Sequence, residues 1–168
     1  MDLLDTLSDP EKRHAALVHF PIVLAMLLPI AITAAALRPR DKSLTGVALA
    51  IGALLVISGM VASSSGETLV ENMATERMDG YEAYEEVYNA GVRQLVEDHE
   101  GAAERIYLMA VAPLVFFIAG VLIKKEPLAA TLRGVAVALA FALAAWTAYA
   151  ASLGGQLVYD HGVGIVDR

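Results

Sequence analysis

Four stretches of the chain contain no charged residue, and each is long enough to cross a lipid bilayer. They cover residues 15–37, 43–66, 106–123 and 134–159. A hydrocarbon core about 30 Å thick needs roughly 17–25 helical residues. The stretches are continuous and rich in alanine and leucine, without the apolar/polar alternation of a membrane barrel. The pattern predicts an all-α, integral membrane four-helix bundle in a single domain, residues 1–168. We place its spans at about 15–37, 44–64, 106–123 and 132–153.

The segment between the second and third spans, residues 67–105, is predicted to be an amphipathic helical loop. Its apolar residues recur at intervals of three and four, which is the spacing of one helix face. They are Tyr81, Tyr84, Tyr88, Val92, Leu95, His99, Ala102 and Ile106. We expect this stripe to pack on or into the bundle, with most of the acidic side chains directed elsewhere.

Proline and glycine positions predict where the helices bend, meet and end. Pro21 and Pro29 lie inside the first span and predict a kink near the outer surface. The second span carries small residues that permit close helix contact in lipid, namely Gly52, Ser58, Gly59, Ala62, Ser63 and Gly66. The pair Gly154–Gly155 predicts the end of the fourth helix, followed by an extended or looped tail.

Charge patterning predicts the orientation in the membrane. The short loops hold the basic residues Arg38, Arg40, Lys42, Lys124, Lys125 and Arg133. Residues 67–105 instead hold eleven acidic and three basic residues. Lys and Arg mark the cytoplasmic side. We therefore expect a multi-pass protein of the bacterial inner membrane, with both termini and the acidic loop on the periplasmic side.

The amino-acid composition limits which partners and cofactors the chain could bind. Apolar residues make up 57% of the chain, charged residues 18%, and the net charge is −7. The negative net charge argues against nucleic acid as a partner and is compatible with a basic protein partner such as a soluble cytochrome. The alternative is that the charges simply solvate an exposed helix. The chain has no cysteine, which excludes disulfides, iron–sulfur ligation and covalent haem attachment through its own thiols.

The four histidines, His14, His19, His99 and His161, are all predicted to lie at the outer end of the bundle. Imidazole ligates haem iron, copper and zinc, and helical bundles build such sites from facing helices. His14 and His19 are five residues apart and therefore point about 140° from each other. We favour His19 with His99 or His161 as the axial pair, and place His14 nearer the rim. The alternative for each histidine is a bond to lipid headgroups or carbonyls.

Motifs distributed along the chain carry a family resemblance. They are HAALVHFPI from His14, Ser58-Gly59, Gly66-Glu67, His99, and GGQLVYDHGVG from Gly154. The sequence resembles, nearly end to end, the domain-of-unknown-function 2231 family of bacterial four-span membrane proteins. Some relatives occur fused to or beside Rieske or c-type cytochrome domains, which implies electron transfer at the outer membrane face. The resemblance implies ligand roles for the four histidines, and close approach to a flat cofactor at Gly154, Gly155, Gly162 and Gly164.

The leading hypothesis is a membrane b-type cytochrome that holds haem b near the outer face. It would pass electrons between a membrane carrier and a periplasmic c-type cytochrome or Rieske protein, alone, as an oligomer or within a larger complex. We expect an electron-transfer protein rather than a stand-alone enzyme. One alternative is a copper or zinc site built from three histidines with Glu67 or Asp160. The second is a cofactor-free structural or accessory subunit.

Overall fold

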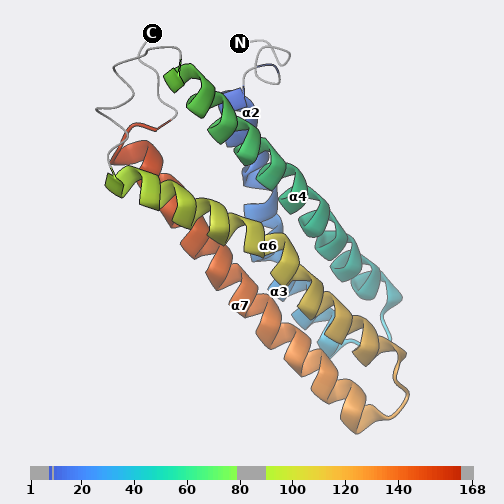
Figure 1. Ribbon diagram of the computed structural model, residues 1–168. Coiled ribbons are helices and arrows are strands. Elements are labelled where there is room, and N and C mark those ends of the chain that lie inside the picture. The colour runs from blue at the N-terminus through green and yellow to red at the C-terminus, as the bar shows by residue number, and fades with distance from the viewer. Residues whose placement is uncertain (1–7, 9, 79–89, 164–168) are drawn as a thin grey trace.

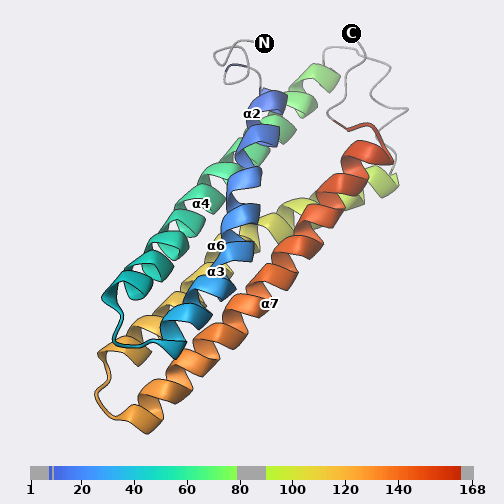
Figure 2. The same ribbon diagram turned by 180° about the vertical axis from the view of Figure 1, so that it is seen from behind.

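The computed structural model describes residues 8, 10–78 and 90–163, which form an all-α bundle (Figures 1 and 2). Its helices are α2 (Pro10–Leu17), α3 (His19–Leu37), α4 (Lys42–Met78), α6 (Ala90–Leu122) and α7 (Glu126–Tyr159). Four stretches are long and apolar enough to cross a membrane: Lys12–Leu37, Lys42–Val70, Gly91–Leu122 and Glu126–Tyr159. The predicted fold class, a four-helix membrane bundle, is confirmed.

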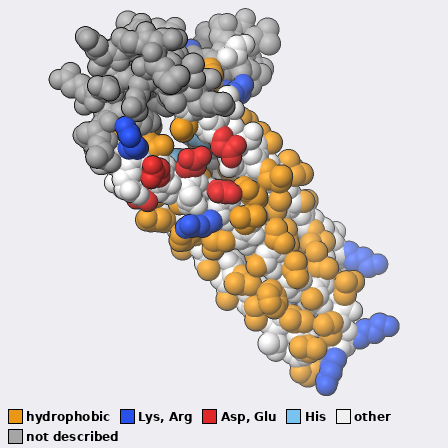
Figure 3. Space-filling view, viewed as in Figure 1, with side chains coloured by type: hydrophobic (Ala, Val, Ile, Leu, Met, Phe, Trp, Pro, Cys, Tyr) orange, Lys and Arg blue, Asp and Glu red, His pale blue; other side chains and the backbone are white. Residues whose placement is uncertain are grey.

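The spans pack as a closed ring of antiparallel neighbours. Helix α3 contacts α4 and α7, and α6 contacts the same two helices from the other side, while α2 packs on α4 (Figure 1). Leu28, Leu55, Phe117 and Leu143 fill the centre, one from each span. Many large apolar side chains remain exposed and form a belt between an acidic end and a basic end (Figure 3). Such a belt is the surface that lipid tails solvate.

Three glycines of α4, each seven residues from the next, receive side chains from neighbouring helices. Seven residues bring a helix back to nearly the same face. Gly52 faces Leu114, and a Cβ atom at Gly59 would lie 3.0 Å from Cβ of Tyr107. Gly66 continues the row toward the acidic end. The predicted close helix contact along the second span is confirmed at these positions.

Pro21 accounts for the interruption between α2 and α3. A proline has no N–H to donate to the carbonyl four residues earlier, here that of Leu17, which is the last residue of α2. Val18 separates the two helices and keeps helical angles, φ −64° and ψ −23°. The interruption falls inside the first span, where a kink was predicted. Pro29, in contrast, is buried within an unbroken stretch of α3.

The helices extend well beyond the predicted spans at the acidic end. Helix α4 continues to Met78 and α6 already begins at Ala90, so the described parts of the predicted outer loop are extensions of the spans. Within this part of the stripe Val92, Ala102 and Ile106 are buried, as predicted. The stripe residues Tyr81, Tyr84 and Tyr88 lie outside the described residues.

The prediction that the fourth helix ends at the Gly154–Gly155 pair is wrong. Helix α7 passes through both glycines and ends at Tyr159. Its start also differs, because α7 begins at Glu126 rather than near residue 132. Arg133, which the sequence analysis counted with the basic residues of the short loop, is buried inside the helix. Gly154 serves close packing rather than termination, since the ring of a histidine lies against it. The only positive φ angle among the described residues belongs to Gly162, at +67°, in the turn after α7.

Candidate functional site

His14 and His99 come together at the acidic end of the bundle. His14 is carried by α2 and His99 by α6, and both are partly buried. The two rings lie close enough for a charge on one to act on the other. His19 is exposed, with its Nδ1 atom 2.6 Å from the carbonyl oxygen of Ala15. His161 is exposed in the turn after α7. The histidine within electrostatic range of His99 is thus His14, whereas the sequence analysis favoured His19, paired with His99 or His161.

The hydrogen bonds of Ser65 determine which nitrogen of His14 carries the proton. The Ser65 hydroxyl donates to the carbonyl of Ala62 at 2.7 Å, so its single proton is already used. Its oxygen then accepts from Nδ1 of His14, 2.8 Å away. A neutral imidazole that is protonated at Nδ1 keeps its lone pair on Nε2. Nε2 of His14 is therefore available as a ligand.

His99 has the same arrangement through a backbone partner. Its Nδ1 atom lies 3.0 Å from the carbonyl oxygen of Ala150 on α7. A carbonyl only accepts, so Nδ1 must donate and Nε2 again carries the lone pair. Metal-bound histidines almost always donate their second ring N–H to a carbonyl, a carboxylate or water in this way, which fixes the ring and the tautomer.

A glycine lies against each of the two rings. A Cβ atom at Gly66 would lie 3.0 Å from Cε1 of His14, and one at Gly154 would lie 2.9 Å from Cε1 of His99. Both distances are too short for an undisturbed contact. Gly155 and Gly162, which the sequence analysis grouped with Gly154, have nothing within 4 Å of such an atom. The fourth glycine of that group, Gly164, lies outside the described residues.

Trp146 ties α7 to α6 beside the site. Its Nε1 atom donates to the carbonyl of Ala102 at 2.9 Å, and Ala102 lies three residues after His99. The guanidinium of Arg105 lies 5.8 Å from the centre of the Trp146 ring. The indole is one helical turn from Ala150, the partner of His99. These contacts fix the two helices relative to each other where the His99 ring crosses between them.

The donor set favours some metals over others. Among the side chains that the structure describes, no three His, Cys, Asp or Glu residues gather in a group that could hold a metal ion. The oxygen ligands suggested by the sequence, Glu67 and Asp160, are both exposed. What the site offers is two imidazole nitrogens from different helices. Two imidazole nitrogens could ligate a haem iron, whose remaining ligands come from the porphyrin itself.

Comparison with known protein families shows to which family the whole chain is related. The family described as "Predicted membrane protein (DUF2231)" matches residues 12–167. The chain belongs to the DUF2231 family. No curated protein and no solved structure matches it. The DUF2231 match spans all four histidines, both ring-contacting glycines and every membrane-spanning stretch, in agreement with the resemblance seen in the sequence motifs.

Sequence reasoning missed Ser65 and Gly66 as parts of the site. A signal for Gly66 was present, because it continues the seven-residue spacing of Gly52 and Gly59 on the packing face of α4. Ser65 had no comparable signal. Its role depends on the position of α2 against α4, which no local pattern gives.

Proposed function

We propose that this DUF2231 protein is a membrane b-type cytochrome, in which His14 and His99 are the axial ligands of one haem b. One observation carries the proposal. The two imidazoles lie within range of each other's charge, and each uses Nδ1 in a protein hydrogen bond. Among the described residues neither Nε2 atom has a partner. The proposal replaces the pairing of His19 with His99 or His161 that the sequence favoured.

The chain's own residues would set the position and the electronic character of such a haem. The hydroxyl of Ser65 and the carbonyl of Ala150 orient the two rings and raise the basicity of their Nε2 atoms. Gly66 and Gly154 leave room for the rings between helices. When bound, the haem would supply one-electron transfer. The surrounding helices would limit the access of water and thereby tune the reduction potential.

We further propose that the protein lies in the bacterial inner membrane and exchanges electrons with a periplasmic protein and a membrane carrier. The basic side chains at one end of the bundle support a cytoplasmic location for that end, in the inner membrane of a bacterium. Both termini and the histidine site would then face the periplasm. The acidic side chains of α6 around the site suit a basic periplasmic redox protein, such as a c-type cytochrome or a Rieske protein. A membrane carrier would be the other partner, and the protein could act within a larger complex.

A copper or zinc protein is the competing proposal. Such a site would use His14 and His99 with at least one further ligand, and no third candidate gathers there within the described residues. A cofactor-free accessory subunit would use the same two histidines only for packing. The fixed tautomers and the free Nε2 atoms support ligation over packing.

Optical spectroscopy tests the proposal. The protein, expressed with ample haem and purified in detergent, should show a Soret band and a sharp α band on reduction with dithionite. A pyridine haemochrome assay should give about one haem b per chain. A colourless protein that carries copper or zinc would replace the haem proposal with the metal proposal. A colourless protein without metal would support the accessory subunit.

A further inference from the structure

An open groove lies at the basic end of the bundle, opposite the histidine site. It is lined by Arg38, Pro39, Arg40, Asp41 and Glu126, and so lies between the α3–α4 loop and the start of α7. We propose that this groove binds the headgroup phosphate of an anionic phospholipid, held by the guanidinium groups of Arg38 and Arg40. The proposal is independent of haem and uses none of the residues of the histidine site.

Both carboxylates in the groove are already engaged. Oδ1 of Asp41 accepts from the backbone N–H groups of Ser43 at 2.9 Å and Leu44 at 3.2 Å, and so caps the start of α4. The positive end of the helix offsets the charge of this carboxylate. Asp41 is therefore directed to the helix rather than to either arginine.

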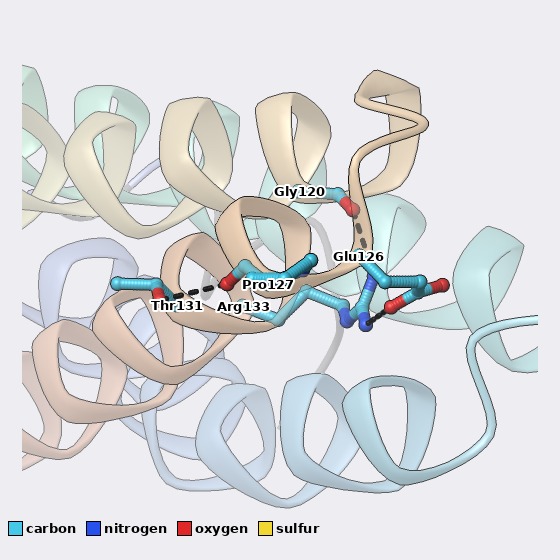
Figure 4. Close-up of polar contacts among 5 residues, drawn as sticks. All are labelled: Gly120, Glu126, Pro127, Thr131 and Arg133. Carbon is cyan, nitrogen blue, oxygen red and sulfur yellow. Dashed lines mark hydrogen bonds and ion pairs between the residues drawn. The ribbon is translucent and has the colours of Figure 1, made fainter.

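Glu126 is held by a buried cation (Figure 4). Its Oε2 atom accepts from an Nη atom of Arg133 at 3.1 Å, while the other Nη of Arg133 donates to the carbonyl of Gly120 at 2.9 Å. Arg133 is buried, and Gly120 lies so close that a Cβ atom there would be 2.7 Å from its Cγ atom. The charge of Glu126 is thus offset by Arg133.

The two arginines of the groove remain available. Both are exposed, and in the described part of the chain neither side chain has a hydrogen-bond, ion-pair or ring partner. A guanidinium matches the geometry of a phosphate with paired N–H donors, and it is more weakly hydrated than an ammonium group. With the two carboxylates offset, the groove presents two free positive charges to an anion.

Neighbouring apolar side chains indicate a lipid rather than a free phosphate ion. Leu37, at the end of the first span, and Leu128, near the start of the fourth, are 78% and 46% exposed and lie close in the chain to residues that line the groove. A phospholipid would place its acyl chains on these side chains while its phosphate meets the arginines. A free phosphate ion would gain nothing from the apolar surface.

Native mass spectrometry of the detergent-purified protein, titrated with phosphatidylglycerol and with phosphatidylcholine, tests this inference. The chain offers a matched control, because Lys124 and Lys125 carry the same charge at the same end but do not line the groove. We expect R38Q/R40Q to weaken phosphatidylglycerol binding roughly tenfold or more. K124Q/K125Q should change it less than about twofold, because these lysines contribute only general attraction to the anionic surface.

Several outcomes would overturn the inference. Equal weakening by the two double variants would mean general electrostatic attraction, and no weakening by R38Q/R40Q would mean that the groove is not the site. Displacement of the lipid by millimolar inorganic phosphate would indicate a site for soluble anions only. Circular dichroism and the melting temperature establish that the variants fold. If R38Q/R40Q fails to fold, the single variants R38Q and R40Q replace it, and each should weaken binding about threefold or more.

Discussion

The imidazole of His99 lies against Gly154 of α7, and its Nδ1 atom donates a hydrogen bond to the carbonyl of Ala150, one turn before Gly154 on α7. Helix α7 therefore holds the ring at two points. One contact fixes the direction in which the ring points, and the other allows it to approach the helix backbone. The position of His99 is set by α7 although the residue belongs to α6.

Replacing Gly154 with alanine should displace the His99 ring. The added Cβ atom would lie 2.9 Å from Cε1 of His99, so the ring or the helix must move. We expect a cost of about 1–3 kcal/mol in stability and a clear loss of bound haem. Gly155→Ala is the matched control, because nothing lies within 4 Å of its new methyl group. Haem content and melting temperature compare the two. Equal behaviour would contradict the assigned contact.

Ser65→Ala tests the partner of His14. The change removes the hydroxyl oxygen that accepts from Nδ1, so the ring loses its orientation and its fixed tautomer. Loss of such an outer partner lowers metal affinity roughly 10–100-fold. We expect a comparable fall in haem affinity, measured by titrating haem into the apoprotein. Ser64→Ala, the adjacent exposed position, should bind haem like the unmodified protein. A wild-type affinity for Ser65→Ala would remove Ser65 from the site.

At the other end of the bundle, Gly120→Ala should destabilise the contact between α6 and α7. The new Cβ atom would lie 2.7 Å from Cγ of Arg133 and 3.0 Å from its backbone nitrogen, so a side-chain rotation alone cannot relieve the clash. We expect a loss of about 1–3 kcal/mol. Gly134→Ala meets nothing within 4 Å and should be neutral or stabilising by up to about 1 kcal/mol through helix propensity. Thermal unfolding in detergent distinguishes the two, and a wild-type melting temperature for Gly120→Ala would contradict the packing described.

The proposed orientation can be read from single cysteines, because the natural chain has none. Glu100 and Ser43 are both exposed, Ser43 at the start of α4 and Glu100 in the first third of α6, beside His99. A thiol reagent that cannot cross membranes should label Glu100→Cys in cells whose outer membrane alone is permeabilised. It should label Ser43→Cys only after the inner membrane is disrupted. The reverse pattern would place the histidine site on the cytoplasmic side.

Those features of the fold that depend on local patterns could be predicted from the sequence. Four uncharged stretches of membrane-spanning length gave the number of spans, and the spacing of Val92, Ala102 and Ile106 gave the buried face of α6. The ends of the helices were predicted less accurately. Gly154 was interpreted as a helix stop from its intrinsic propensity, but α7 continues through it, and its missing side chain leaves room for the His99 ring.

The candidate site was predictable in its residue type and its end of the bundle, but not in its pairing. The five-residue separation of His14 and His19 shows that they face different directions, without showing which one faces the bundle. That choice depends on the packing of α2 against α4, which places His14 on Ser65 and Gly66. Arg133 was missed for a similar reason, since a basic residue near a span end is ordinarily an exposed loop residue.

The central claim is that His14 and His99 together bind one haem, and spectra of four single variants test it most directly. Reduced-minus-oxidised spectra and haem stoichiometry should be measured for His14→Ala, His99→Ala, His19→Ala and His161→Ala, after circular dichroism has established that each variant folds. The b-type spectrum should be lost or changed to a high-spin form in the first two variants and retained in the last two, whose histidines are exposed. A wild-type spectrum in His14→Ala, with loss of the spectrum in His19→Ala, would contradict the account.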